Sequence, residues 1–170
     1  MIIRLLTTDD ASSYLLLRLN ALRDHPTAFS SSYEEECHTP LETIAERLSA
    51  KDDRAIFGAF NDEGLCGMAG IRREDMRKES HKANIWGVYV APRARATGVG
   101  QKIISRALLF AEDDLKVIQV NLSVNSKNLA AIALYERMGF ITFGFEKRYL
   151  MVNGEPQDEW HMVRFLDNIE

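Results

Sequence analysis

Residues 88 to 100 read Val88-Tyr89-Val90-Ala91-Pro92-Arg93-Ala94-Arg95-Ala96-Thr97-Gly98-Val99-Gly100. Its apolar and aromatic residues predict a strand up to Val90, and Pro92 ends that strand. From Gly98 to Ala111 the apolar residues repeat with helical spacing. A glycine-containing turn between a strand and a helix presents unpaired backbone N–H groups and the positive end of a helix dipole. The stretch therefore predicts a site for phosphate oxygens.

Charge along the chain supports an anion site at this turn. Between Ser80 and Ala111 there is no Asp or Glu, and that segment carries +5, whereas the rest of the chain carries −9 within a total of −4. The turn lacks the third small residue and the downstream acid of a dinucleotide fingerprint, and it also lacks the Gly-Lys-Ser/Thr of a P-loop. Two interpretations stay open at this point: a phosphate site of another kind, or a structural turn with solvated arginines.

Outward from this turn, strands and helices follow one another without a repeat or a linker, which predicts one α/β domain over residues 1–170. Strands are predicted at 2–6, 54–60, 65–71, 84–91, 117–124, 140–150 and 158–166. Helices are predicted from about 8 to 24, 40 to 48, 98 to 111 and 128 to 138, with 24–39 as a working loop. The expected apolar faces are Leu15, Leu16, Leu19 and Leu22 in the first helix, and Ala130, Ala131, Ile132 and Leu134 in the last.

Composition excludes several classes of protein. The 170 residues are 46% hydrophobic and 27% charged, which is typical of a globular domain. Cys37 and Cys66 lack metal-ligand spacing, so we expect no metal site and a reducing, cytoplasmic location. No apolar stretch is long enough to span a bilayer, and no export signal is visible. A pI near 5.6 argues against nucleic acid or an anionic membrane as partner.

A second segment helps to interpret the turn at Gly98. It reads Val124-Asn125-Ser126-Lys127-Asn128-Leu129-Ala130-Ala131-Ile132-Ala133-Leu134-Tyr135-Glu136-Arg137-Met138-Gly139-Phe140. Together with the Arg-x-x-Gly-x-Gly turn, it resembles the acetyl-CoA-dependent N-acetyltransferases of the GNAT superfamily. The resemblance implies a mixed, mostly antiparallel sheet of six to seven strands that is splayed at its centre and flanked by about four helices.

The resemblance also implies roles for individual residues. The backbone amides that would wrap the pyrophosphate of CoA belong to Arg95, Ala96, Thr97, Gly98, Val99, Gly100 and Gln101. The pantetheine arm would lie along Val88, Tyr89 and Val90, whose backbone N–H groups can also stabilise an oxyanion. Asn128 and Ala131 would contact the cofactor, and Tyr135 would protonate the departing thiolate.

The reaction implied is transfer of an acetyl group to a primary amine. Neither cysteine lies in a cofactor motif, so we expect direct attack within a ternary complex. The base is not assigned by the sequence. Asn84 and Trp86 stand where related enzymes often place a carboxylate, and neither can accept a proton. His81 is more simply a surface histidine, and a water chain ending at Glu34 or Glu35 would serve instead.

The acceptor pocket is expected between residues 25–37 and the turn at 152–158. Acidic side chains on both walls favour a cationic small-molecule amine such as a polyamine or an aminoglycoside; the four expected there are Glu34, Glu35, Glu155 and Asp158. A lysine or N-terminal amine of a protein is an alternative acceptor, and a homodimer is possible. A second alternative is a regulatory protein that binds CoA without turnover.

Overall fold

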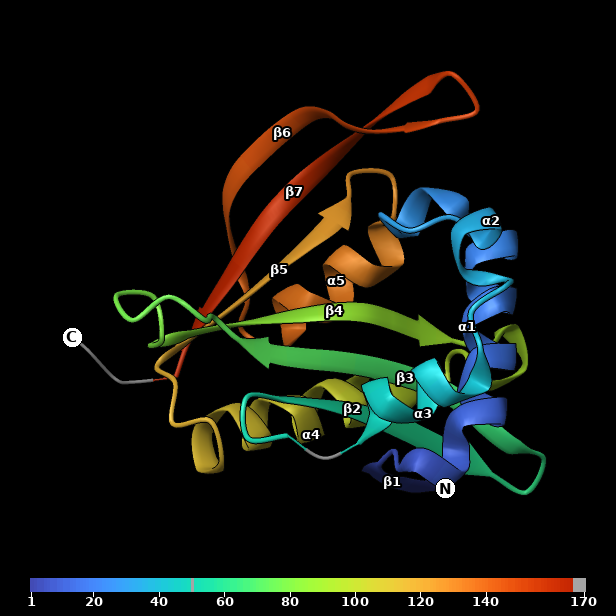
Figure 1. Cartoon of the computed structure of the whole chain (residues 1–170). Helices are drawn as coiled ribbons and strands as arrows, with labels where there is room; N and C mark the ends of the chain where they lie inside the picture. The colour runs from blue at the N-terminus through green and yellow to red at the C-terminus, as the bar shows by residue number, and fades with distance from the viewer. Residues whose placement is uncertain (50, 167–170) are drawn as a thin grey trace.

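One seven-stranded sheet organises the computed structural model, which describes residues 1–49 and 51–166. The strand order is β1-β2-β3-β4-β5-β7-β6, and all neighbours are antiparallel except β4 and β5 (Figure 1). The strands are β1 (Ile2–Leu5), β2 (Arg54–Asn61), β3 (Gly64–Arg73), β4 (Lys82–Val90), β5 (Gln119–Asn125), β6 (Ile141–Val152) and β7 (Glu155–Phe165). The predicted mixed sheet is confirmed.

The part of the chain that the structure describes forms five α-helices, one more than predicted. They are α1 (Ala11–Asp24), α2 (Tyr33–Glu36), α3 (Leu41–Leu48), α4 (Val99–Asp113) and α5 (Leu129–Arg137). The additional helix, α2, is a single turn within the segment predicted as a loop, and Ser32 and Glu35 cap it reciprocally. Within residues 1–49 and 51–166, no helix has the length and apolar content that crossing a membrane requires.

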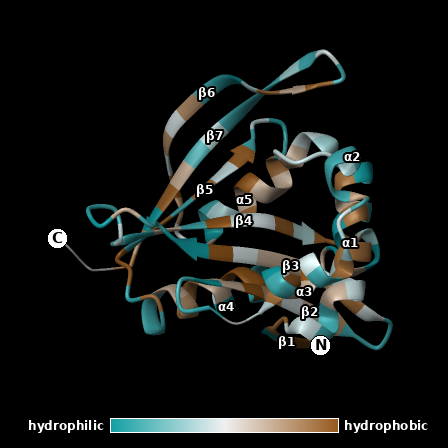
Figure 2. Ribbon diagram, in the orientation of Figure 1, coloured by the Kyte–Doolittle hydropathy of each residue, from teal (hydrophilic) through white to brown (hydrophobic). Residues whose placement is uncertain are grey.

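Strand β3 lies at the centre of the hydrophobic core. Every residue from Leu65 to Ile71 is buried, because α4 packs on one face of the sheet and α1 on the other. Figure 2 shows hydrophobic residues concentrated on β3, β4 and the helices beside them. At Gly67 an added Cβ would lie 2.7 Å from Ile103 Cδ1, so the absence of a side chain there lets α4 pack close to the sheet.

The sheet opens between β4 and β5. These strands pair only over Lys82–Asn84 and Gln119–Asn121, and from Leu122 onward β5 pairs with β7 alone. A β-bulge in β4 sets two residues, Gly87 and Val88, opposite Ala69, and Gly87 has a φ of 63°. A bulge bends its strand, so β4 turns away from β5 (Figure 1). The splay predicted from the family resemblance is therefore present.

The two predicted helix faces are confirmed only in part. Leu22 of α1 is buried as predicted, and Leu15 and Leu19 are half-buried. In α1, Leu16 is 65% exposed, whereas Tyr14, Leu17 and Arg18 are buried. Arg18 is buried because it has a carboxylate partner, which apolar periodicity does not register. In α5, the predicted residues Ala131, Ile132 and Leu134 are half-buried against the core. Ala130 is exposed, and part of this face lines an open cleft.

Candidate active site

A cleft of about 790 Å³ occupies the opening between β4 and β5. Its walls are the bulged half of β4, the end of β5, the turn before α4 and one face of α5. The basic side chains that line it are His25, Arg95, Lys127 and Arg137, and no Asp or Glu lines it among the described residues. A concave site of this size and charge fits an elongated polyanion.

The turn before α4 is built to accept an anion. Gly98 is the N-cap residue with a φ of 80°, and a Cβ there would meet no atom within 4 Å, so the turn opens onto free space. The first backbone hydrogen bond of α4 is donated by Lys102 N to Gly98 O at 3.1 Å. The N–H groups of Val99, Gly100 and Gln101 precede it and have no acceptor within the helix. The residues present therefore fit the pyrophosphate of CoA.

With Tyr135 included, thirteen residues were predicted to contact the cofactor, and twelve of them line this cleft. Thr97 is the exception, because its hydroxyl donates to Ala94 O at 2.8 Å. Arg95 does not extend freely toward a phosphate. Its Nε donates to the Val90 carbonyl at 3.0 Å and its Nη2 lies 2.8 Å from His25 Nε2. The Val90 carbonyl, expected to face the pantetheine arm, therefore already has a donor.

Tyr135 and Asn128 lie at opposite ends of α5. Tyr135 is 5% exposed, packs edge-on against Phe140 and lines the cleft. Burial raises the pKa of its phenol above the ordinary value, so the hydroxyl keeps its proton at neutral pH. Asn128 is the N-cap of α5, and its Oδ1 accepts from Ala131 N at 3.2 Å. Gly139, with a φ of 83°, follows the helix as predicted.

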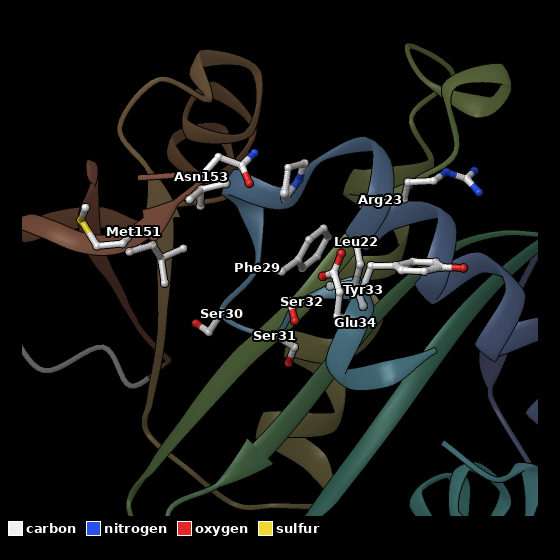
Figure 3. A pocket seen from close by; sticks show the side chains of 13 residues that line it. Leu22, Arg23, Phe29, Ser30, Ser31, Ser32, Tyr33, Glu34, Met151 and Asn153 are labelled. Carbon is white, nitrogen blue, oxygen red and sulfur yellow. The ribbon is translucent and has the colours of Figure 1, made fainter. Parts of the chain in front are cut away.

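A second pocket of about 390 Å³ lies between the segment after α1 and the β6–β7 hairpin. Phe29 lines both this pocket and the cofactor cleft, so the two cavities flank one side chain. Figure 3 shows the Glu34 carboxylate directed into the pocket beside the Phe29 ring, whereas the Arg23 guanidinium points away. Arg23 is paired with Asp24 at 3.0 Å. Glu34 is therefore the charged group that faces the pocket interior.

The other acids expected on the pocket walls do not line it. Glu35 Oε2 accepts from Ser32 N at 2.7 Å, and this bond helps to hold the pKa of that carboxyl below its usual range. Asp158 Oδ1 accepts from Arg148 N at 2.8 Å, and Glu155 is exposed at the start of β7. These carboxylates accept from backbone N–H groups or face solvent, so Glu34 alone of the four acids expected on the pocket walls lines the pocket.

The candidate base positions on β4 also differ in their surroundings. Trp86 is 39% exposed and lines the cleft, whereas Asn84 donates to Glu74 and lies outside it. His81 precedes β4 at the surface and lines neither cavity. Among the described residues, no group of three His, Cys, Asp or Glu side chains is placed to hold a metal ion.

A buried ion pair that the sequence did not reveal holds the acceptor side of the site. Arg18 on α1 donates from Nη2 to Glu36 Oε1 at 2.9 Å, and the side chains are 7% and 12% exposed. Arg18 also stacks on the Phe29 ring, with 4.9 Å from Cζ to the ring centroid. The pair fixes α2 against α1 and thereby places the pocket wall between them. The place of Arg18 among the apolar residues of α1 is a signal in the sequence, but it does not identify Glu36 as the partner.

Comparison with known proteins agrees with this geometry. A family model described as an acetyltransferase (GNAT) domain matches residues 3–161. The chain is 29% identical to the L-amino acid N-acetyltransferase AaaT of Escherichia coli over 70% of this chain and 73% of that protein. It is 33% identical to the N-alpha-acetyltransferase RimI of Mycobacterium tuberculosis over 64% of this chain and 65% of that one.

Structural comparison supports the same fold. The structure of yncA from Salmonella typhimurium with acetyl-CoA superposes with a TM-score of 0.86, covering 100% of this chain and 96% of that one at 18% identity. The chain spans 44% of two mycothiol acetyltransferases that it also matches. Because the family model matches nearly the whole chain, the protein belongs to the GNAT family and is an acetyl-CoA-dependent N-acetyltransferase.

Proposed function

We propose that the chain transfers the acetyl group of acetyl-CoA to a primary amine of a small molecule, by direct attack while donor and acceptor are both bound. The observation that carries this proposal is the pair of cavities that flank Phe29. The larger cavity is long, basic and bounded by the N-terminus of α4. The smaller one is lined by the carboxylate of Glu34. Two adjoining cavities of different chemistry suit two substrates that must meet.

The cofactor cleft supplies binding and orientation. The N–H groups of Val99, Gly100 and Gln101 hold the pyrophosphate, and Arg137 and Lys127 add positive charge along the cleft. The unpaired edge of β4 around Val88 receives the pantetheine amides. Bound acetyl-CoA supplies its acetyl group as an activated thioester at the splayed end of β4.

Tyr135 is the proton donor to the sulfur in this proposal. Its raised pKa ensures that the phenol is protonated, although it also makes the phenol a weaker acid. Proton transfer to a thiolate, whose pKa is about 8.5 for an ordinary thiol, is therefore uphill. The contribution of Tyr135 must come from a fixed position beside the sulfur, and burial against Phe140 supports such a position.

The smaller pocket favours a cationic amine with apolar substituents. Its charged group is Glu34, its polar groups are three serine hydroxyls and the Asn153 amide, and its apolar walls include Phe29 and Leu22. Relatives named as an L-amino acid N-acetyltransferase and a spermidine N(1)-acetyltransferase act on small amines by name. A volume of about 390 Å³ suits such molecules.

Direct attack is supported by the position of the two cysteines. Cys66 is buried between strands, its Sγ lies 3.3 Å from Ala59 O, and burial raises the pKa of its thiol. Neither Cys66 nor Cys37 lines either cavity. An acetylated cysteine would need an accessible, activated thiol beside the thioester.

The proposal is tested by following thiol release from acetyl-CoA against a panel of alkyl amines and amino acids. We expect turnover with at least one amine, and Tyr135→Phe should lower kcat by at least about tenfold with little change in CoA affinity. Tyr14→Phe is the matched control, because Tyr14 is buried at 4% exposure but lines neither cavity. Binding of CoA without thiol release for any amine would favour the regulatory alternative and contradict the proposal.

A further inference from the structure

Glu159 on β7 is a buried carboxylate without a full set of partners. It is 5% exposed, and its Oε2 has no hydrogen-bond partner among the described residues. A buried ionised carboxylate is costly unless it is paired, and unsatisfied buried polar atoms are rare in folded proteins. Such a group requires an explanation in the function of the molecule or in its folding.

The pairing of β7 with β5 places Glu159 just behind the cofactor cleft. Asn125 is its direct partner on β5, so the two side chains share one face of the sheet, and Ser123 lies two residues earlier on that same face. Both Asn125 and Ser123 line the cleft. Asn125 also ties this face to the acceptor side of the site, because its Nδ2 donates to Thr27 O at 3.1 Å.

The surroundings of Glu159 raise the affinity of its carboxylate for a proton. Burial raises the pKa of the carboxyl, the Ser123 hydroxyl and His161 on β7 oppose this, and Glu146 on β6 adds to it. His161 and Glu146 pair with each other at 3.0 Å, and the turn Pro26–Ala28 brings no charged side chain to this face. A carboxylate with a raised pKa is a stronger base than an ordinary one.

We propose that Glu159 receives the proton that the acceptor ammonium must lose, and that the Ser123 hydroxyl relays it from the cleft. This inference rests on the proposed function and supplies the base that the sequence left unassigned. The ammonium gives a proton to the Ser123 oxygen while the Ser123 hydroxyl proton passes to Glu159, which becomes neutral. The free amine nitrogen then bonds to the acetyl carbon as the carbon–sulfur bond breaks.

The remaining protons balance in the same scheme. The thiolate takes its proton from Tyr135, and the second proton lost by the nitrogen restores the Tyr135 phenol. Glu159 returns its proton to solvent, which accounts for the single proton released when an ammonium becomes an amide. Glu159 acts through Ser123 and does not touch the substrate, so its test needs a measurement that a purely structural role would not change.

The test compares Glu159→Gln with the unsubstituted full chain on two acceptors: an alkylamine that is charged at pH 7, and an arylamine that is already neutral. For the alkylamine, kcat/KM at pH 7 should fall at least about 100-fold, and the deficit should shrink toward pH 10, where the amine is free. For the arylamine the loss should stay below about threefold. Glu155→Gln, an exposed carboxylate on the same strand, is the control and should match the unsubstituted chain.

Two further measurements separate proton transfer from misfolding. Ser123→Ala, a change at an exposed position, should show the same selective loss for the alkylamine. In the unsubstituted chain with 13C-labelled glutamate side chains, one carboxyl signal should titrate above the ordinary range, and Glu159→Gln should remove that signal.

The possible results distinguish the role of Glu159 from the proposed function. An equal loss with both amines, no loss with either, or a glutamate spectrum without a raised signal would refute this inference while leaving the proposed function intact. Failure of the unsubstituted chain to acetylate any amine would refute the proposed function and this inference together. CoA affinity within about twofold of the unsubstituted chain is expected for both variants.

Discussion

The buried pair between Arg18 and Glu36 predicts a large and specific loss of stability. Glu36→Gln keeps the shape of the side chain but leaves the Arg18 guanidinium without its counter-charge at 7% exposure. Arg47, whose Nη1 lies 3.9 Å from Glu36 Oε2, adds a second positive charge to the same place. Removing one partner of a buried pair costs about 3–5 kcal/mol. For a chain of this length that lowers Tm by roughly 6–20 °C.

The stability that Glu36 contributes should also depend on pH in a definite direction. Burial opposes ionisation of Glu36, but the hydrogen bonds and charge of Arg18 outweigh it and hold the pKa of the carboxyl below its usual range. A lowered pKa contributes stability that is complete above the pKa of the unfolded chain and is lost as the pH falls through the folded value. The difference in unfolding free energy between Glu36→Gln and the unsubstituted chain should therefore be constant above about pH 5 and shrink in acid.

Urea unfolding between pH 3 and pH 8 measures this difference. Glu46→Gln is the control, because Glu46 is exposed on α3 and its loss should change stability by no more than about 0.5 kcal/mol. Arg18→Met combined with Glu36→Leu should recover most of the loss, because apolar replacement removes both charges. A cost below about 1 kcal/mol for Glu36→Gln, or a double variant as unstable as the single one, would show that an unpaired Arg18 charge is not what destabilises the fold.

Three further predictions follow from other contacts. Hydrogen bonds from Arg4 lower the pKa of the Asp10 carboxyl to about 2. Asp10→Asn should therefore lower the free energy of unfolding by about 1–2 kcal/mol at pH 7. In urea titrations this loss should vanish as the pH falls from 4 to 2. Gly98→Ala and Gly154→Ala, both at a φ of 80° in open space, should each cost about 1 kcal/mol by calorimetry, yet only Gly98→Ala should weaken CoA binding. Replacing Cys37 and Cys66 by alanine should leave kcat within about threefold, whereas a loss above 100-fold would indicate an acetylated cysteine.

Local signals predicted the parts of the fold that depend on local chemistry. The turn at Asn153 and Gly154, the helix stop at Gly139 and the order of strands around α4 follow from backbone preferences that a single sequence records. The cleft lining near Gly98 was predictable for the same reason, because the turn itself forms the site.

Features that depend on partners distant in the chain were not predictable. Burial of Arg18 depends on Glu36, which lies 18 residues away on another helix. Glu159 reads as an ordinary polar residue of a strand, and its burial depends on the pairing of β7 with β5 and β6. The half-burial of Ala131 and Leu134 on α5 was not predictable either, because apolar spacing does not distinguish the core from the wall of an open cleft.

We propose that the turn before α4 and the bulged edge of β4 hold CoA. An amide NMR titration of the 15N-labelled chain with CoA examines these residues one by one. We predict saturable shifts that are largest at Gly98, Gly100 and Gln101, with smaller ones at Val88 and Tyr135. Saturable binding that leaves these amides unmoved and shifts those of another surface would contradict the claim.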